Sequence, residues 1–152
     1  MEARIALSFA AIALMSAAVA NGADSKLPAG PIHDRHELME RIGGNAKIIG
    51  DAMKAGDLSP VPAAADKIKE DAAKALPLFP EGSTHESSRA LPAIWEQWPK
   101  FEASMKDLED KAGKLAEAAR SGGDVGAASK AMFGNCKSCH DQFRKPDEDE
   151  KS

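Results

Sequence analysis

The sequence is poor in the residues that build sheets and disulfide-rich folds. It contains no tyrosine, two tryptophans and five phenylalanines among 152 residues, and aromatic residues are enriched in strands. Two cysteines are too few for a disulfide framework. The formal net charge is −4, and we find no basic stretch of the kind that predicts nucleic-acid binding. Alanine, lysine, glutamate and leucine dominate instead, and these residues favour helices.

A long apolar run occurs at the N-terminus. Arg4 precedes an unbroken run of apolar and small residues from Ile5 to Val19, and Ala18-Val19-Ala20 fits the small-x-small rule for cleavage. We therefore expect residues 1–20 to be a cleaved signal peptide, with a retained membrane helix as the alternative. The mature chain would be a soluble periplasmic protein with no stable membrane insertion. Residues 21–31 contain Gly, Pro and small polar groups and predict a flexible leader.

Apolar residues at spacings of three and four mark four helical segments. These segments cover residues 34–55, 60–76, 92–120 and 124–144. Pro99 lies inside the third segment and predicts a kink near Trp95. Mostly short connections predict an all-α fold, an antiparallel up-down-up-down four-helix bundle over residues 32–145. The acidic tail, residues 146–152, is expected to be disordered.

Both cysteines lie in one short motif, Cys136-Lys137-Ser138-Cys139-His140. C-x-x-C-H is the pattern by which a c-type haem is attached. Each thiol adds to one vinyl group of the porphyrin, and His140 can then ligate the iron. A disulfide has poor geometry at this helical spacing, a thioredoxin-type pair needs a βαβ unit, and a zinc site needs a second ligand pair. We therefore expect one haem c, covalently bound through two thioethers.

The second axial position of the iron depends on the start of the first helix. In antiparallel order this start meets the end of the last helix, where the motif lies. Met39 is on the apolar seam there, and a thioether ligand gives low-spin iron of raised potential. His36 is the rival ligand, and an open site would bind small gases. Arg35 and Arg144 are expected to neutralise haem propionates. Gly43-Gly44 indicates either a kink or close approach to a flat ligand.

These features resemble the class II c-type cytochromes that include cytochrome c-prime. CKSCHDQFR at residues 136–144 is similar to the haem-binding end of that family, including the arginine four residues after the histidine. RHELM at residues 35–39 matches the R-x-x-x-(M or L) spacing of its distal residue. Residues 76–101 are similar to the central segment of its low-spin members.

The resemblance implies the low-spin, methionine-ligated subgroup. Its members carry electrons and transform no substrate, so we expect an electron-transfer protein and not an enzyme. The expected partners are other periplasmic redox proteins, which would dock weakly on a monomer or homodimer. Two hypotheses stay open beside this one. The first is a high-spin protein that binds NO or CO at an open site, and the second is a haem-free helical interaction module.

Overall fold

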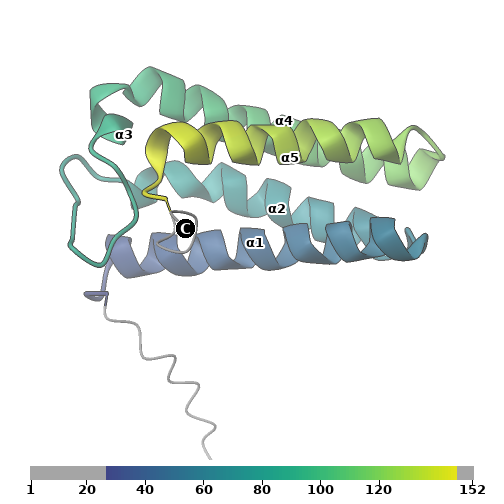
Figure 1. The fold of residues 1–152 in the computed structure, drawn as a ribbon, viewed down its shortest axis with the longest axis horizontal. Helices are drawn as coiled ribbons and strands as arrows, with labels where there is room; N and C mark the ends of the chain where they lie inside the picture. The colour runs from purple at the N-terminus through teal and green to yellow at the C-terminus, as the bar shows by residue number, and fades with distance from the viewer. Residues whose placement is uncertain (1–26, 147–152) are drawn as a thin grey trace, which may run out of the picture.

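Four long helices alternate in direction in the computed structural model, which describes residues 27–146 (Figure 1). A one-turn helix and a short 3-10 turn lie between the second and third of them. The elements are α1 (Pro31–Ala55), α2 (Val61–Ala75), η1 (Leu76–Leu78), α3 (Ala93–Glu96), α4 (Trp98–Ser121) and α5 (Val125–Phe143). Within residues 27–146 the only strand-like pairing is an isolated bridge between Ala90 and Arg144. The predicted all-α four-helix bundle is confirmed.

Glycine and aspartate form the two tight turns at one end of the bundle. Gly56 after α1 and Gly122 after α4 adopt left-handed conformations, with φ of 72° and 74°. Such residues end helices, because only glycine takes this conformation without steric cost. Asp124 caps α5 as its Oδ1 accepts a hydrogen bond of 2.8 Å from the backbone N–H of Ala127.

The core follows the predicted apolar seams. The fully buried side chains come from every long helix: Leu38, Ile49, Val61, Ile68, Leu115 and Met132. Burying a side chain of this size contributes about 1.5–3 kcal/mol to folding. Phe101 of α4 stacks edge-on against both Phe79 and Phe143, with ring centroids 4.7 and 5.4 Å apart. The core therefore joins the end of α2 to the end of α5 through α4.

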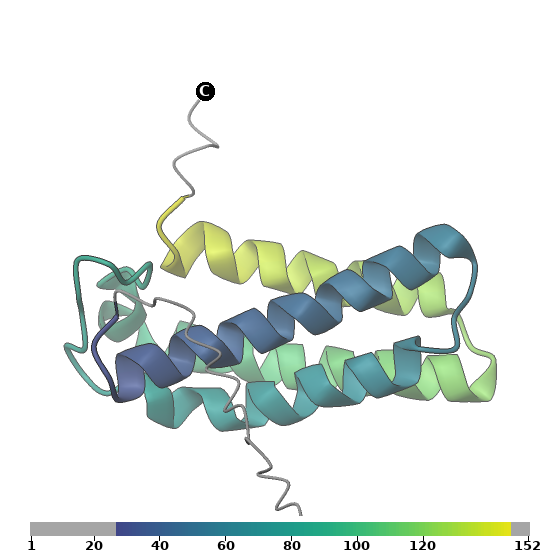
Figure 2. The ribbon, with the colours of Figure 1, turned by 90° about the horizontal axis from the view of Figure 1, so that it is seen from below.

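α1 and α5 spread apart toward the end of the bundle where α1 begins and α5 ends, as Figure 2 shows. Direct packing between these two helices is sparse, whereas α2 packs extensively on α1 and α4. The C-x-x-C-H motif lies in the last two turns of α5, at this open end. The arrangement leaves room for a ligand beside the motif.

Two boundaries differ from the sequence prediction. Pro99 does not kink a continuous helix but lies in the first turn of α4, and Gln97, with φ −124° and ψ 38°, separates α3 from α4. Proline has no N–H to donate, so the first turn of a new helix accommodates it at least cost. For the same reason α1 begins at Pro31 rather than near Asp34, so the predicted leader ends earlier.

The predicted signal peptide and most of the acidic tail lie outside the described residues. Among residues 27–146, no helix has both the length and the apolar character that a membrane span requires.

Candidate haem site

A cavity of about 440 Å³ lies at the open end of the bundle, among α1, α4, α5 and the segment that precedes α3. This volume is typical of cavities that hold organic ligands. Apolar side chains form most of its walls: Ile42 from α1, Ile94 from α3, Phe101, Met105 and Leu108 from α4, and Phe133 and Phe143 from α5. The site is therefore a largely apolar chamber to which three of the four long helices contribute.

The whole C-x-x-C-H motif faces this chamber. Cys136, Cys139 and His140 all line it, because positions three and four apart share one face of α5. The two thiols are half-buried and are not joined to each other. Burial raises the pKa of Cys136, and burial together with the neighbouring Cys136 raises the pKa of Cys139 to about 11. Neutral thiols in an apolar setting are poor redox nucleophiles.

A metal-ion site of the zinc type finds no support in the part of the chain that the structure describes. No group of three or more His, Cys, Asp or Glu side chains comes together there. A zinc site needs such a set, usually four ligands in tetrahedral order. The two cysteines therefore fit attachment to an organic group better than coordination of a bare ion.

Met39 and His36 line the chamber from α1, opposite the motif. Met39 is half-buried and packs against the core. The His36 side chain is 43% exposed, and its Nε2 lies 3.3 Å from Oε1 of Glu40. His36 thus contacts a carboxylate at the rim, whereas Met39 belongs to the wall. Met53 lies 14 positions after Met39, about 21 Å along a straight helix, and does not line the chamber.

Gly43 also lines the chamber, one turn after Met39. A Cβ atom at Gly43 would meet no atom within 4 Å apart from its own helix's neighbouring backbone, so there is open space beside this residue. Helix α1 continues through Gly43 and Gly44 without a break. This placement favours the second interpretation of the glycine pair, in which the missing side chain leaves space for a flat ligand.

The predicted propionate partners lie at the chamber, but Arg35 has other contacts. Its Nη1 donates to Oγ of Ser83 at 2.7 Å, and its Nη2 donates to the Ser83 carbonyl at 2.6 Å and to Oγ of Ser88 at 3.0 Å. Arg35 is only 4% exposed, and burial lowers its pKa. Arg144 is half-buried and also lines the chamber. Propionate binding by Arg35 and Arg144 stays a prediction.

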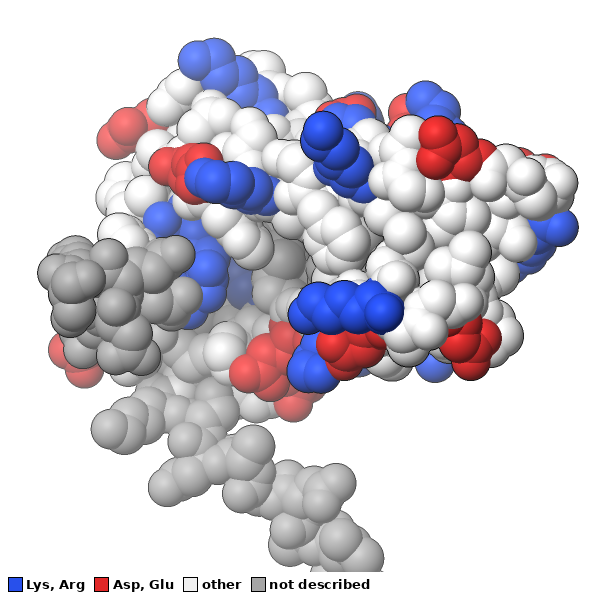
Figure 3. All heavy atoms as spheres, turned by 45° about the vertical axis from the view of Figure 1, so that its right-hand side comes forward, with Lys and Arg blue, Asp and Glu red and all other residues white. Residues whose placement is uncertain are grey.

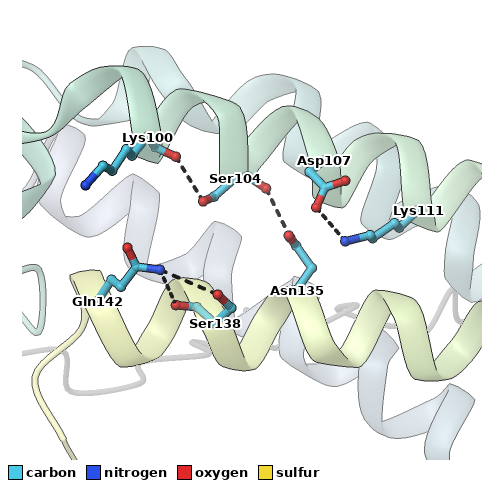
Figure 4. Close-up of polar contacts among 7 residues, drawn as sticks. All are labelled: Lys100, Ser104, Asp107, Lys111, Asn135, Ser138 and Gln142. Carbon is cyan, nitrogen blue, oxygen red and sulfur yellow. Dashed lines mark hydrogen bonds and ion pairs between the residues drawn. The ribbon is translucent and has the colours of Figure 1, made fainter.

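Sequence reasoning missed Asn135, the residue before the motif. It is 8% exposed, lines the chamber, and donates from Nδ2 to the carbonyl of Ser104 on α4 at 3.0 Å (Figure 4). The bond fixes α5 against α4 immediately before Cys136. A polar residue on the apolar side of α5 was the available signal. In Figure 4 the neighbouring polar pairs, such as Asp107 with Lys111, stay within one helix.

Charges on the surface are mixed in sign. On the face shown in Figure 3, basic and acidic side chains lie beside one another. Pairs of this kind include Lys106 with Glu102 and Lys137 with Asp141, each four residues apart on a helix. That face therefore offers no continuous basic surface, and the expectation that the chain does not bind nucleic acid stays a prediction.

The residues of the chamber fit a covalently attached haem. Two thiols and a histidine come from one helix face, the walls are apolar, and Met39 and Gly43 face them from α1. A porphyrin needs a flat apolar slot, two thiols for its vinyl groups and an axial ligand. The chamber supplies the apolar walls, the two thiols and the histidine from the chain's own side chains.

Comparison with known proteins agrees with this fit. The family described as "Cytochrome C'" matches residues 30–144. Cytochrome c' of Rhodospirillum rubrum is 33% identical over 147 residues, which cover 93% of this chain and 97% of the relative. Cytochrome c-554 of Cereibacter sphaeroides is 37% identical over 132 residues, with 76% and 93% covered. The solved cytochrome c' from Rhodopseudomonas palustris is 31% identical, with a TM-score of 0.68 over 78% of this chain and 98% of that one.

The matched region spans every helix and includes the motif, the distal segment of α1 and the chamber between them. These matches identify the family and do not by themselves select the methionine-ligated subgroup that the resemblance implied. The chain belongs to the cytochrome c' family and carries one covalently attached haem c.

Proposed function

We propose that this cytochrome is an exported electron-transfer protein whose iron is held by His140 on one side and Met39 on the other. The observation that carries the proposal is that both side chains line the same chamber, His140 from α5 and Met39 from α1. When bound, the haem supplies an iron that exchanges one electron between its ferrous and ferric states. Cys136 and Cys139 hold the porphyrin against α5, so the group is not lost on reduction or oxidation.

The surroundings of Met39 support its choice over His36. Met39 packs against the core from the chamber wall, and the His36 side chain is directed to Glu40 at the rim. A thioether is a soft, neutral ligand that favours ferrous iron and raises the reduction potential. The apolar walls act in the same direction, because they disfavour the extra positive charge of ferric iron.

The remaining expectations follow from this assignment. The chain would act outside the cytoplasm and exchange electrons with other periplasmic redox proteins, without transforming a substrate. His140 is exposed although it lines the chamber, so the edge of the site lies near the surface. Weak docking at such an edge suits rapid exchange between partners. Monomer and homodimer both stay compatible with this role.

The family match favours a second candidate, a high-spin protein with an open distal site that binds NO or CO. The relative from Rhodospirillum rubrum, matched over nearly its whole length, is itself named cytochrome c'. A solved structure described as a nitric oxide complex of a cytochrome c prime mutant from Alcaligenes xylosoxidans shares the fold, at 24% identity and a TM-score of 0.68. At that identity the likeness concerns the fold alone. Space beside Gly43 would suit a small distal ligand.

Optical and electron paramagnetic resonance spectra of the purified holoprotein decide between the two candidates. We expect low-spin spectra in both oxidation states and slow binding of carbon monoxide. Met39→Ala should convert the iron to high spin and speed carbon monoxide binding, because the sixth position is then vacant. His36→Ala is the matched control from the same helix and should leave the spectra unchanged. A high-spin spectrum of the unmodified protein would overturn the proposal in favour of the open site.

A further inference from the structure

We call residues 83–91 the strap. The strap makes hydrogen bonds to both helices that carry the proposed axial ligands, namely α1 with Met39 and α5 with His140. At one end the strap pairs with the end of α5. The backbone N–H of Leu91 donates to the Phe143 carbonyl at 3.0 Å, and the N–H of Lys145 donates to the Arg89 carbonyl at 2.8 Å. In Figure 1 the segment runs across the end of the bundle, from the start of α1 to the end of α5.

The side chain of Arg35 on α1 holds the first part of the strap, at Ser83 and Ser88. The guanidinium donates three hydrogen bonds of 2.6–3.0 Å to Ser83 and Ser88. Its Cζ also lies 5.2 Å from the ring centroid of Phe79 and 6.0 Å from that of Trp95, which is close enough for cation–π attraction. A buried guanidinium is costly unless its N–H donors are satisfied. These contacts are therefore strongly favoured over an arrangement in which Arg35 is separated from the strap.

The position of Arg35 gives this contact a consequence at the iron. Arg35 precedes Met39 by four residues, about one helical turn, so both lie on the chamber side of α1. The strap's other attachment, at Phe143 and Lys145, lies within five residues of His140. The strap therefore links the start of α1 to the end of α5 through hydrogen bonds at each attachment and its own backbone between them. Direct packing between these two helices is sparse.

We propose that Arg35 is a positioning residue that latches the strap across the chamber and thereby fixes the distal wall of α1 relative to the proximal end of α5. The latch sets how easily an external ligand reaches the iron beside Met39. This role differs from the propionate pairing that the sequence suggested, because it acts through the serines of the strap. The effect on ligand binding rests on the proposed function, whereas the effect on the strap itself does not.

Two measurements on holoprotein variants test the latch. The first is amide hydrogen–deuterium exchange of peptides from the strap and from residues 140–145, and the second is the rate of carbon monoxide association with ferrous protein. In Arg35→Met we expect exchange in both peptides to rise at least about tenfold, the factor that corresponds to about 1.4 kcal/mol, and carbon monoxide to bind faster. A double variant, Ser83→Ala with Ser88→Ala, should shift both readouts in the same direction by a smaller factor, because the Ser83 carbonyl still accepts a bond.

Arg41→Met is the matched control, since Arg41 lies on the same helix but pairs with Asp71 of α2 at 3.2 Å. It should change neither readout. Arg35→Lys should not restore the latch, because a single ammonium does not span both serines as the guanidinium fork does. The proposal is overturned if Arg35→Lys behaves as the unmodified protein and the serine variant has no effect, since Arg35 would then act through its charge alone.

An equal rise of exchange in α2 and α4 of Arg35→Met would also overturn the proposal, because Arg35 would then support the whole bundle rather than the strap. The spectra described above test the proposed function separately. A high-spin unmodified protein would remove the role of Met39 as ligand, and the exchange pattern would still test whether Arg35 holds the strap.

Discussion

Replacing Ser129 by alanine should stabilise the protein. Ser129 lies in α5, is 4% exposed, and its Oγ has no hydrogen-bond partner among the described residues. A buried hydroxyl without a partner costs about 1–3 kcal/mol, and alanine is also the better helix former by about 0.5 kcal/mol. The oxygen that is removed leaves a void, which offsets part of this gain. We therefore expect Ser129→Ala to raise the free energy of unfolding by about 1–2 kcal/mol.

Thermal unfolding of the holoprotein, followed by far-ultraviolet circular dichroism, measures this effect. A gain of 1 kcal/mol should raise the Tm by about 4 °C in a domain of this size. Ser121→Ala is the control, because that hydroxyl is exposed and donates to the Glu117 carbonyl at 2.9 Å. It should change the stability by less than about 0.5 kcal/mol. If Ser129→Ala unfolds at the same or a lower temperature, the hydroxyl makes a bond in solution and the reasoning is refuted.

Three further predictions concern the chamber. Burial raises the pKa of Cys139 to about 11. In the folded haem-free chain, alkylation of this thiol near pH 8 should therefore be about a hundredfold slower than in denaturant. Equal alkylation rates in the two conditions would contradict the burial. Because the folded pKa exceeds the unfolded one, this thiol stabilises the haem-free fold below about pH 9, and that contribution is lost as the pH rises through about 11. Gly43→Leu should lower the haem content per chain in a pyridine haemochrome assay, since the side chain enters the chamber, whereas Gly44→Leu, outside the lining, should not.

The sequence predicted the parts of the molecule that follow a regular period. Spacings of three and four predicted the long helices, and their antiparallel order predicted that Met39 and His140 lie at the same end of the bundle, where both line the chamber. The Asp124 cap and the glycine turns were predictable for the same local reasons. Local chemistry and helical periodicity were sufficient for these features because each involves neighbouring turns or one repeated face.

The strap and its contacts were not predictable in this way. Residues 83–91 have no period, so nothing in their order indicates that Ser83 and Ser88 accept bonds from a helix about fifty positions earlier. Pro99 allowed either a kink or a new helix, and the sequence did not indicate that Gln97 would leave the helical conformation and separate α3 from α4. Asn135 was overlooked because its partner, the Ser104 carbonyl, belongs to another helix.

The walls of the chamber come from the first and the last long helices of the chain, and this has a consequence for biogenesis. A nascent polypeptide that stops short of α5 has neither the two thiols nor the wall that carries them. In a folded chain without haem the same thiols would be shielded and protonated, which would make them slow to react. We therefore expect the two thiols to react with haem most readily before α5 packs onto α4.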